Sequence, residues 1–394
     1  MNHLLGRLAP CFALVLTLVV AAGCGHHAGP TTPSPTVTLA QAVEQARLRH
    51  GLPAIAAASF TLDSVEVAVS GVRRLGVATP ATAADLFHVG SLAKGMTATA
   101  IGALVDDGLL SWSLTLAEAF PEFAATMDTA YRAVTLAELL QNRSGAPGFN
   151  DLEEFAAVPP FPGDVTAQRH AFVGWLLAQP PAVARGTYLY STAGFSVAAA
   201  IAEARSGQHW DDLLRARVLT ALGTNLFIGW PLEAGPDEPC GHMPVGGVLQ
   251  PVEPSAGHIP GVLAPGGDVS MTVRGYADYA RLHLQALCGR PGVLAPATWA
   301  ALHAPVGDYA MGWSVIEADG NVALTHTGSP ATFYAFVVLY RNQRHGFVVI
   351  MNADTPEVDG AILDILTAMA PSVSAATTRA AIANTRPLGS GRAR

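Results

Sequence analysis

The sequence predicts an α/β (α+β) fold: an antiparallel sheet built from the N- and C-terminal segments and flanked by helices, with an inserted helical domain. Strand-like apolar runs occur near both ends of the chain, whereas alanine- and leucine-rich stretches with helical spacing fill its middle. The chain has 394 residues, of which 50% are hydrophobic and 13% charged, so it can bury one large core or two adjoining ones. Segments in this order are typical of a sheet that carries an inserted helical body.

Local patterns predict the individual elements within a domain over residues 39–370, followed by a weakly structured tail over 371–394. A helix is expected at 39–49, because apolar residues recur with helical spacing until Gly51 and Pro53 end the pattern. A polar turn at 341–345 joins the last two predicted strands as a hairpin. The sheet part covers 39–88 and 305–370 and the helical part 89–304; the expected strands are 54–60, 65–70, 323–325, 333–340 and 347–351, and the clearest later helices are 96–105, 193–204, 275–287 and 361–369.

The N-terminus has the pattern of a targeting segment. Residues 1–23 combine a positive charge with a long apolar run, as a secretory signal peptide does. The run ends in Val20 to Cys24, which resembles a bacterial lipoprotein box; ordinary secretory cleavage nearby is the alternative. Residues 24–38 are rich in Gly, Pro, Ser and Thr, as a flexible tether is. We therefore expect an exported bacterial protein, periplasmic or at the cell surface, that is anchored to a membrane through lipid on Cys24.

Charge and cysteine content exclude several kinds of partner. The net charge of -8 leaves no basic surface for nucleic acid. The sequence contains neither a Cys-x-x-Cys nor a His-Glu-x-x-His motif, so a metal is not expected. Cys240 and Cys288 could pair in an oxidising compartment, and two unpaired thiols are the alternative. We expect a monomer.

One lysine stands out among the basic residues. Lys94 is the only lysine in the sequence, beside 21 arginines. An amine can lose its proton under conditions in which a guanidinium cannot. Lys94 follows Ser91 by three residues near the start of a predicted helix, so the amine and the hydroxyl would share one helix face. This pairing indicates a serine nucleophile activated by a lysine base. Codon bias is the alternative explanation for the lysine count.

Two later motifs supply candidate partners for this pair. Tyr190 precedes the predicted helix at 193–204 and offers a phenol that could relay a proton if the site lowers its pKa. His326 ends a strand-like run; Gly328 then lets a substrate approach the backbone, and the amide of Ser329 can point at an oxyanion. The alternatives are a core tyrosine at 190 and a hydrogen-bonded edge-strand histidine at 326.

Together these motifs resemble the serine β-lactamases and penicillin-binding proteins, specifically the class C-like branch of β-lactamase-related serine hydrolases. The resemblance covers roughly residues 39–370 and implies a β-lactamase/transpeptidase-like fold. It implies that Ser91 forms an acyl-enzyme and that Lys94 and Tyr190 share the base and acid duties, without a cofactor. The backbone amides of Ser91 and Ser329 would form the oxyanion hole. The segments that carry the resemblance are Phe87–Lys94, Val134–Gly145, Tyr188–Phe195, Tyr309–Trp313 and His326–Gly328.

The chain departs from the family pattern at four places. Thr192 stands where the tyrosine motif usually ends in asparagine, and His326 stands where true β-lactamases carry a lysine. A histidine is mostly neutral at about pH 7, so it gives no permanent cation for a substrate carboxylate. Asn142 replaces the usual histidine of the second segment, and the glycine expected downstream of His326 is missing from residues 330–333.

These departures favour an ester or a D-amino-acid amide over penicillin as the substrate. The resemblance places Thr192, His326, Thr327 and Gly328 at the substrate. Two alternatives remain open. One is a β-lactamase or D,D-carboxypeptidase acting on peptidoglycan-type peptides, and the other is a non-catalytic member that binds cell-wall peptides or a protein partner.

Overall fold

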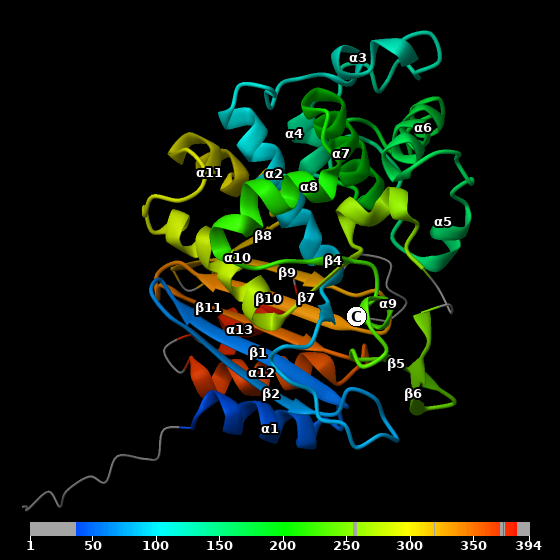
Figure 1. Cartoon of the computed structure of the whole chain (residues 1–394). Coiled ribbons are helices and arrows are strands. Elements are labelled where there is room, and N and C mark those ends of the chain that lie inside the picture. Colours follow the sequence, from blue (N-terminus) through cyan, green and yellow to red (C-terminus); the bar gives the residue numbers. More distant parts are fainter. Residues whose placement is uncertain (1–36, 255–257, 319, 371–372, 374, 384–394) are drawn as a thin grey trace, which may run out of the picture. The chain divides into compact units, whose positions relative to one another are not determined.

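The large sheet is built from both ends of the domain, as predicted (Figure 1). A computed structural model describes residues 37–254, 258–318, 320–370, 373 and 375–383. The sheet has the order β2-β1-β11-β10-β9-β8, and the pairing of β1 with β11 joins the two ends of the domain. Its strands are β1 (Ala54–Thr61), β2 (Val65–Gly71), β8 (Ser314–Ala318), β9 (Asn321–Gly328), β10 (Tyr334–Tyr340) and β11 (His345–Met351).

Helices cover both faces of this sheet, which explains why its central strands are apolar throughout. On one face, α1 (Leu39–Arg49) and α12 (Val358–Met369) pack on Ile55 and Ala57 of β1. On the other face, α10 (Val273–Leu287) packs on Ala56 and Ala58 of the same strand. Figure 1 shows these helices on opposite sides of the sheet. The inserted segment therefore also contributes to the core of the sheet, through α10.

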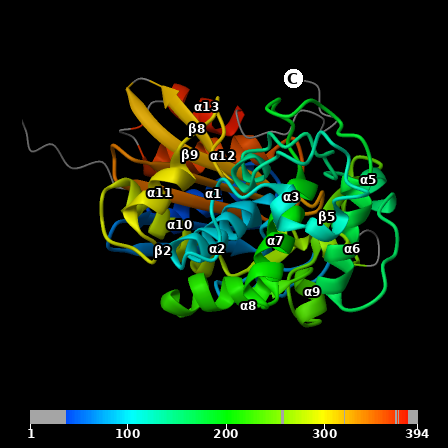
Figure 2. The same cartoon turned by 90° about the horizontal axis from the view of Figure 1, so that it is seen from above.

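The rest of the inserted segment is mainly helical and has a core of its own. Apolar residues of α2, α4, α6 and α7 form this core, and Figure 2 shows α2 and α7 side by side. The helices are α2 (Ala93–Asp106), α3 (Leu116–Ala119), α4 (Leu136–Leu140), α5 (Leu152–Ala156), α6 (Val165–Leu177), α7 (Thr192–Ser206), α8 (Trp210–Leu214), α9 (Pro231–Ala234) and α11 (Pro296–His303). Short helical turns are η1 (Gly90–Leu92), η2 (Pro121–Phe123), η3 (Arg215–Leu219), η4 (Thr220–Leu222) and η6 (Gly261–Gly266), and short strands are β3 (Phe87–His88), β4 (Phe227–Ile228), β5 (Gly241–Val245), β6 (Val248–Val252) and β7 (Val269–Met271).

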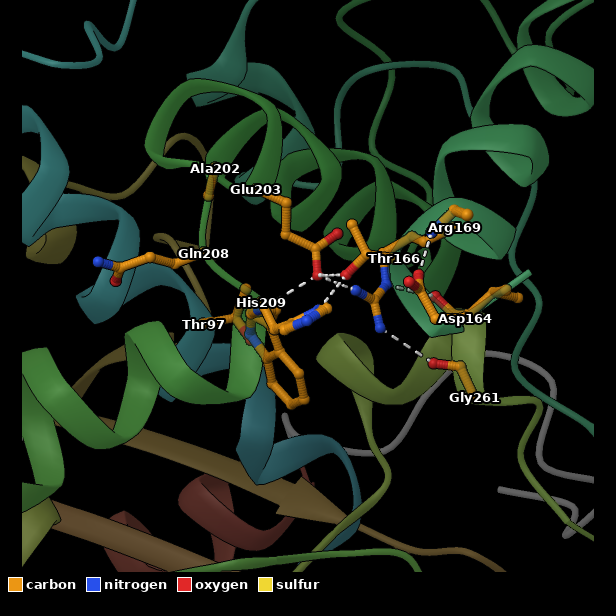
Figure 3. A network of polar contacts seen from close by, with 12 residues as sticks. Thr97, Asp164, Thr166, Arg169, Ala202, Glu203, Gln208, His209 and Gly261 are labelled. Atoms are coloured by element: carbon orange, nitrogen blue, oxygen red, sulfur yellow. Dashed lines mark hydrogen bonds and ion pairs between the residues drawn. The ribbon is translucent and has the colours of Figure 1, made fainter.

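A buried ion pair ties the helical layer to η6 (Figure 3). Arg169 of α6 donates to Glu203 of α7, and the same Glu203 oxygen accepts from the backbone N–H of Trp210 at 2.9 Å. The guanidinium also donates to the carbonyls of Gly261 and Val262, at 3.2 Å each. Removing one partner of such a pair leaves a buried charge without compensation, at a cost of about 3–5 kcal/mol. The pair therefore holds η6 in place.

Two of the elements that form or cover the large sheet differ from the sequence prediction. The tail predicted to be weakly structured contains a further helix, α13 (Ala375–Ala383), whose Ala381 and Ile382 are buried against the sheet. The edge strand β8 was not predicted, because Ser314–Ala318 is short and mixes polar with apolar residues. In both cases contact with β9 stabilises a segment whose own pattern is weak.

The cysteine pairing considered from the sequence is wrong, because Cys240 and Cys288 are both free. Cys240 is buried before β5, with its Sγ 3.2 Å from the carbonyl oxygen of Val252. Cys288 caps α10 instead, and its Sγ lies 3.8 Å from the carbonyl oxygen of Arg341. The two thiols thus contact different parts of the fold.

The expected signal peptide, the lipidation site at Cys24 and nearly all of the expected tether lie outside the described residues. Within the described part of the chain, no helix combines the length and the apolar character needed to cross a membrane.

Two histidines behind α2 make the stability of the fold sensitive to acid. Nδ1 of His283 lies 2.9 Å from Nε2 of His303, and Nε2 of His283 lies 2.8 Å from the Tyr279 hydroxyl. Burial lowers the pKa of His303 to about 4. The pKa of His283 is also lowered, mainly by burial and to a smaller extent by the neighbouring His303. Below the ordinary histidine pKa of 6.5 the unfolded chain therefore binds more protons than the folded chain.

We expect the free energy of unfolding to be highest above about pH 6.5 and to fall as the pH drops toward 4. Each of the two histidines adds up to about 1.4 kcal/mol per pH unit in this window. Urea unfolding of the protein and of His303→Gln at several pH values measures the slope. The variant should lose the contribution of one histidine, and identical slopes would contradict the assignment.

Candidate active site

Ser91 lies at the junction between β3 and α2, inside the turn η1. Gly90 precedes it with φ +54, a left-handed conformation that glycine adopts without strain. The N–H of Gly90 donates to Nδ1 of His88 at 3.1 Å, so the proton of this ring is on Nε2, which donates to Asp268 at 3.0 Å. These contacts fix the turn that presents Ser91.

Lys94 lies beside Ser91 on the first turn of α2 and is fully buried. Its Nζ is 3.2 Å from Ser91 Oγ, 3.0 Å from Thr192 Oγ1 and 2.7 Å from the carbonyl oxygen of Gly266. Burial lowers the pKa of Lys94 well below its ordinary value, because desolvation disfavours the ammonium form. The site thus favours a neutral amine.

The partners of Lys94 suit that neutral amine. Two N–H groups can donate to the Gly266 carbonyl and to Thr192, whose own hydroxyl donates to Oδ1 of Asn150 at 3.0 Å. The amine lone pair then remains to accept the proton of Ser91. This arrangement is what a general base for a serine nucleophile requires.

Two asparagines fix the backbone around Tyr190. The backbone carbonyl of Asn142 accepts from the N–H of Leu189 at 2.9 Å, and its Oδ1 accepts from the N–H of Ser191 at 3.1 Å. Nδ2 of Asn150 donates to the carbonyl of Tyr190 at 2.9 Å. Asn142 has φ 58, a left-handed conformation that asparagine tolerates better than most residues. In this chain Asn142 therefore positions the tyrosine.

The ring centroid of Tyr190 lies 4.5 Å from Nζ of Lys94, and both residues line the site around Ser91. Burial raises the pKa of Tyr190 above its ordinary value, although the nearby side chain of Ser91 partly opposes this effect. The lowered pKa on which the proton-relay hypothesis depended is therefore not found. A phenol that keeps its proton suits donation to a leaving group, which leaves Lys94 as the better base.

Two glycines bring the candidate oxyanion-hole amides together. A Cβ on Gly90 would lie 2.8 Å from the backbone nitrogen of Ser329. A Cβ on Gly328 would lie 2.1 Å from the carbonyl oxygen of Val89 and 2.7 Å from the backbone nitrogen of Ser91. The two backbones can approach this closely only because neither residue has a side chain. The backbone nitrogens of Ser91 and Ser329 therefore lie close together, which an oxyanion hole built from both of them requires.

His326 is buried on β9 and is neutral. Its Nδ1 donates to the carbonyl of Thr327 at 2.7 Å, so Nε2 is left to accept from the Tyr309 hydroxyl at 3.3 Å. Burial, the largest cause, lowers the pKa of His326 to about 3. The residue therefore cannot act as a cation toward a substrate carboxylate at neutral pH.

A cavity of about 1210 Å³ opens over Ser91. Five carboxylates line it, and Arg143 is the only lysine or arginine among the described residues of its wall. Both terminal nitrogens of Arg143 donate to carbonyls, of Gly186 and of Val306, at 2.7 Å each. Within the described part of the chain, no group of three or more His, Cys, Asp or Glu is arranged to hold a metal ion. The carboxylates are those of Asp151, Glu153, Glu154, Asp308 and Asp354.

The structure brings the predicted site residues together. The cavity wall contains Ser91, Tyr190, Thr192, His326, Thr327 and Ser329; Gly328 adjoins it, and Lys94 lies behind Ser91. Sequence reasoning missed the carbonyl of Gly266 and the side chain of Asn150. Both come from Pro- and Gly-rich loops, where no residue pattern indicates a hydrogen bond to a site far along the chain.

Comparison with known proteins agrees with the fold and with the predicted resemblance. Penicillin-binding protein 4 of Amycolatopsis lactamdurans is 28% identical over 307 residues, which cover 74% of this chain and 78% of that protein. Among solved structures, D-amino acid amidase from Ochrobactrum anthropi SV3 complexed with L-phenylalanine has a TM-score of 0.68 at 19% identity, covering 85% of this chain and 99% of that chain. The class C beta lactamase from Rhodobacter sphaeroides has a TM-score of 0.64 at 19% identity, covering 84% and 99%.

At such identities the two structures show the fold alone. The family model described as Beta-lactamase matches residues 39–370, which is most of the sequence. The chain therefore belongs to the beta-lactamase family.

Proposed function

We propose that the protein is a serine hydrolase that cleaves an ester or amide through an acyl-enzyme on Ser91. The observation that carries the proposal is the buried Lys94 amine, with its lowered pKa, 3.2 Å from Ser91 Oγ. Ser91 Oγ attacks the acyl carbonyl while its proton passes to Nζ of Lys94. The backbone N–H groups of Ser91 and Ser329 donate hydrogen bonds to the oxyanion.

The phenol of Tyr190 then protonates the leaving alcohol or amine as the acyl bond breaks. The phenol regains a proton from Lys94, whose Nζ lies 4.5 Å from the ring centroid. In the second half of the cycle, water attacks the acyl-enzyme, and the same groups return the proton to Ser91. Over the whole cycle one proton departs with the leaving group and one enters from water, and Ser91, Lys94 and Tyr190 relay both.

The cavity favours substrates without a carboxylate near the scissile bond. His326 is neutral there, because burial lowers its pKa to about 3. The guanidinium of Arg143 is bound to two backbone carbonyls, and five carboxylates line the wall. A negative field of this kind repels a substrate carboxylate and attracts an ammonium group. We therefore propose an amine-bearing amide or an uncharged ester, as in a D-aminopeptidase or esterase, ahead of a penicillin.

Ser91→Ala should remove the activity. We expect the rate of p-nitrophenyl butyrate hydrolysis to fall by on the order of 10³-fold or more, since the nucleophile is lost. Labelling by a fluorophosphonate, followed by mass spectrometry, should give one adduct on Ser91. Ser111→Ala, at an exposed serine outside the cavity wall, is the matched control. Equal rates for the protein and Ser91→Ala, with no adduct, would instead favour a non-catalytic binding protein.

Lys94→Arg tests whether the lysine acts by losing its proton. A guanidinium keeps the positive charge but stays protonated, so we expect acylation to fall by about 10²–10⁴-fold. Lys94→Met fills similar apolar space, and its rate of acylation should fall to the same level. Thermal melting followed by circular dichroism shows whether each variant is folded. A folded Lys94→Arg protein with wild-type acylation would refute the base assignment.

The charge of the substrate tests the assignment of the pocket. We expect kcat/KM for D-alanine p-nitroanilide to exceed that for its N-succinyl derivative by about tenfold or more, with the ratio shrinking as salt screens the carboxylates. Both anilides have the same leaving group, and the salt dependence of the ratio reports the contribution of charge. Nitrocefin turnover that depends on the substrate carboxylate would favour a β-lactamase or D,D-carboxypeptidase instead.

A further inference from the structure

The turn after β9 carries the Ser329 amide in a strained backbone. Ala331 has φ +70, which lies in the left-handed region that alanine rarely adopts. The family pattern expects a glycine in the segment 330–333, and this chain has none there. Some other interaction must therefore hold the turn in this conformation.

The hydroxyl of Ser329 supplies two such contacts. The N–H of Ala331 donates to Ser329 Oγ at 2.9 Å, which closes the turn. Because Oγ accepts there, its single proton is free to go to Oδ2 of Asp354, at 2.5 Å. This distance is typical of a charge-assisted O–H to carboxylate bond, about twice as strong as a neutral one.

Hydrogen bonds of the nearby Asn352 hold the backbone that carries Asp354. Asp354 follows β11 and the buried Asn352, whose Oδ1 accepts from the N–H of Ala54 at 2.8 Å. The backbone carbonyl of Asn352 accepts from Nδ1 of His242 at 2.8 Å. The side-chain Nδ2 of Asn352 donates to the carbonyl of Val72 at 3.2 Å. The carboxylate of Asp354 can therefore act as a fixed anchor for the turn.

We propose that Asp354 is a positioning residue for the oxyanion hole. Through the Ser329 hydroxyl it holds the strained turn, so that the Ser329 amide stays beside the Ser91 amide across the contact between Gly90 and Gly328. This inference rests on the proposed function, because it concerns stabilisation of the transition state. Residues that act in this way affect kcat rather than KM, since the amide binds the oxyanion only as it forms.

The test compares three variants on p-nitrophenyl butyrate, an uncharged ester whose attraction to the pocket does not depend on the lost charge. Asp354→Ala should lower kcat by about tenfold or more, with KM changed by less than about threefold; full loss of one oxyanion donor costs about 10²–10³-fold. Asp354→Asn keeps an acceptor for the Ser329 hydroxyl, so its kcat should lie between those of Asp354→Ala and the unmodified protein. Glu66→Gln, at an exposed carboxylate outside the cavity wall, is the control and should match the unmodified protein.

The decisive variant is Asp354→Ala combined with Ala331→Gly. Glycine adopts the left-handed conformation without strain, so the double variant should recover most of the kcat lost in Asp354→Ala. A wild-type kcat in Asp354→Ala, a loss that appears in KM alone, or a loss that Ala331→Gly does not recover would each overturn the proposal. Melting temperatures confirm that all variants are folded.

Amide hydrogen exchange separates this proposal from the proposed function. Peptides that contain Ser329 and Ala331 should exchange faster in Asp354→Ala and return toward the original rate in the double variant. This readout needs no catalysis. It therefore still tests the role of Asp354 if the protein and Ser91→Ala hydrolyse esters at equal rates and the proposed function fails. Unchanged exchange in Asp354→Ala would show that Asp354 does not hold the turn.

Discussion

The burial of the Lys94 amine among uncharged partners is the constraint on which the rest of the site depends. A carboxylate at hydrogen-bond distance would stabilise the ammonium form and remove the base. The three partners of Nζ are instead two hydroxyls and one backbone carbonyl. They come from η1, from the first residue of α7 and from η6, so three segments that lie far apart in the sequence must converge on one nitrogen.

Charge is present near this nitrogen, but the fold places it one layer further out. Arg169 and Glu203 fix η6 through its carbonyls, while η6 in turn offers the carbonyl of Gly266 to Lys94. A Cβ on Gly266 would lie 2.6 Å from Cγ2 of Thr192, so η6 rests directly on the start of α7. The buried ion pair therefore acts on the position of an uncharged acceptor, not on the lysine itself. Such an arrangement keeps the loop rigid while the amine stays easy to deprotonate.

The sequence predicts the parts of this design that depend on local pattern. The sheet from both ends, the helix that begins near Ser91 and the family resemblance all follow from periodicity and short motifs, and the structure and the family match confirm them. The acceptor carbonyl of Gly266 has no such signal, because every residue carries a carbonyl and only the fold decides where it points. The raised pKa of Tyr190 was missed for a related reason. Burial determines the direction of that shift, and burial is a property of the assembled site.

Three departures from the family motif were the grounds for a non-catalytic alternative, and each of these three has a local compensation in the structure. The Thr192 hydroxyl, which lacks the amide of the usual asparagine, is joined to the carboxamide of Asn150 at 3.0 Å. Asn142, in place of a histidine, accepts from the backbone N–H groups of Leu189 and Ser191, on either side of Tyr190. Ala331, in a turn without glycine, is held by the hydroxyl of Ser329. An inert site would have no reason to keep a desolvated amine beside a serine, because burying Lys94 without a counter-ion costs stability. The compensations, together with that cost, argue for a site in which Lys94 and Ser91 react.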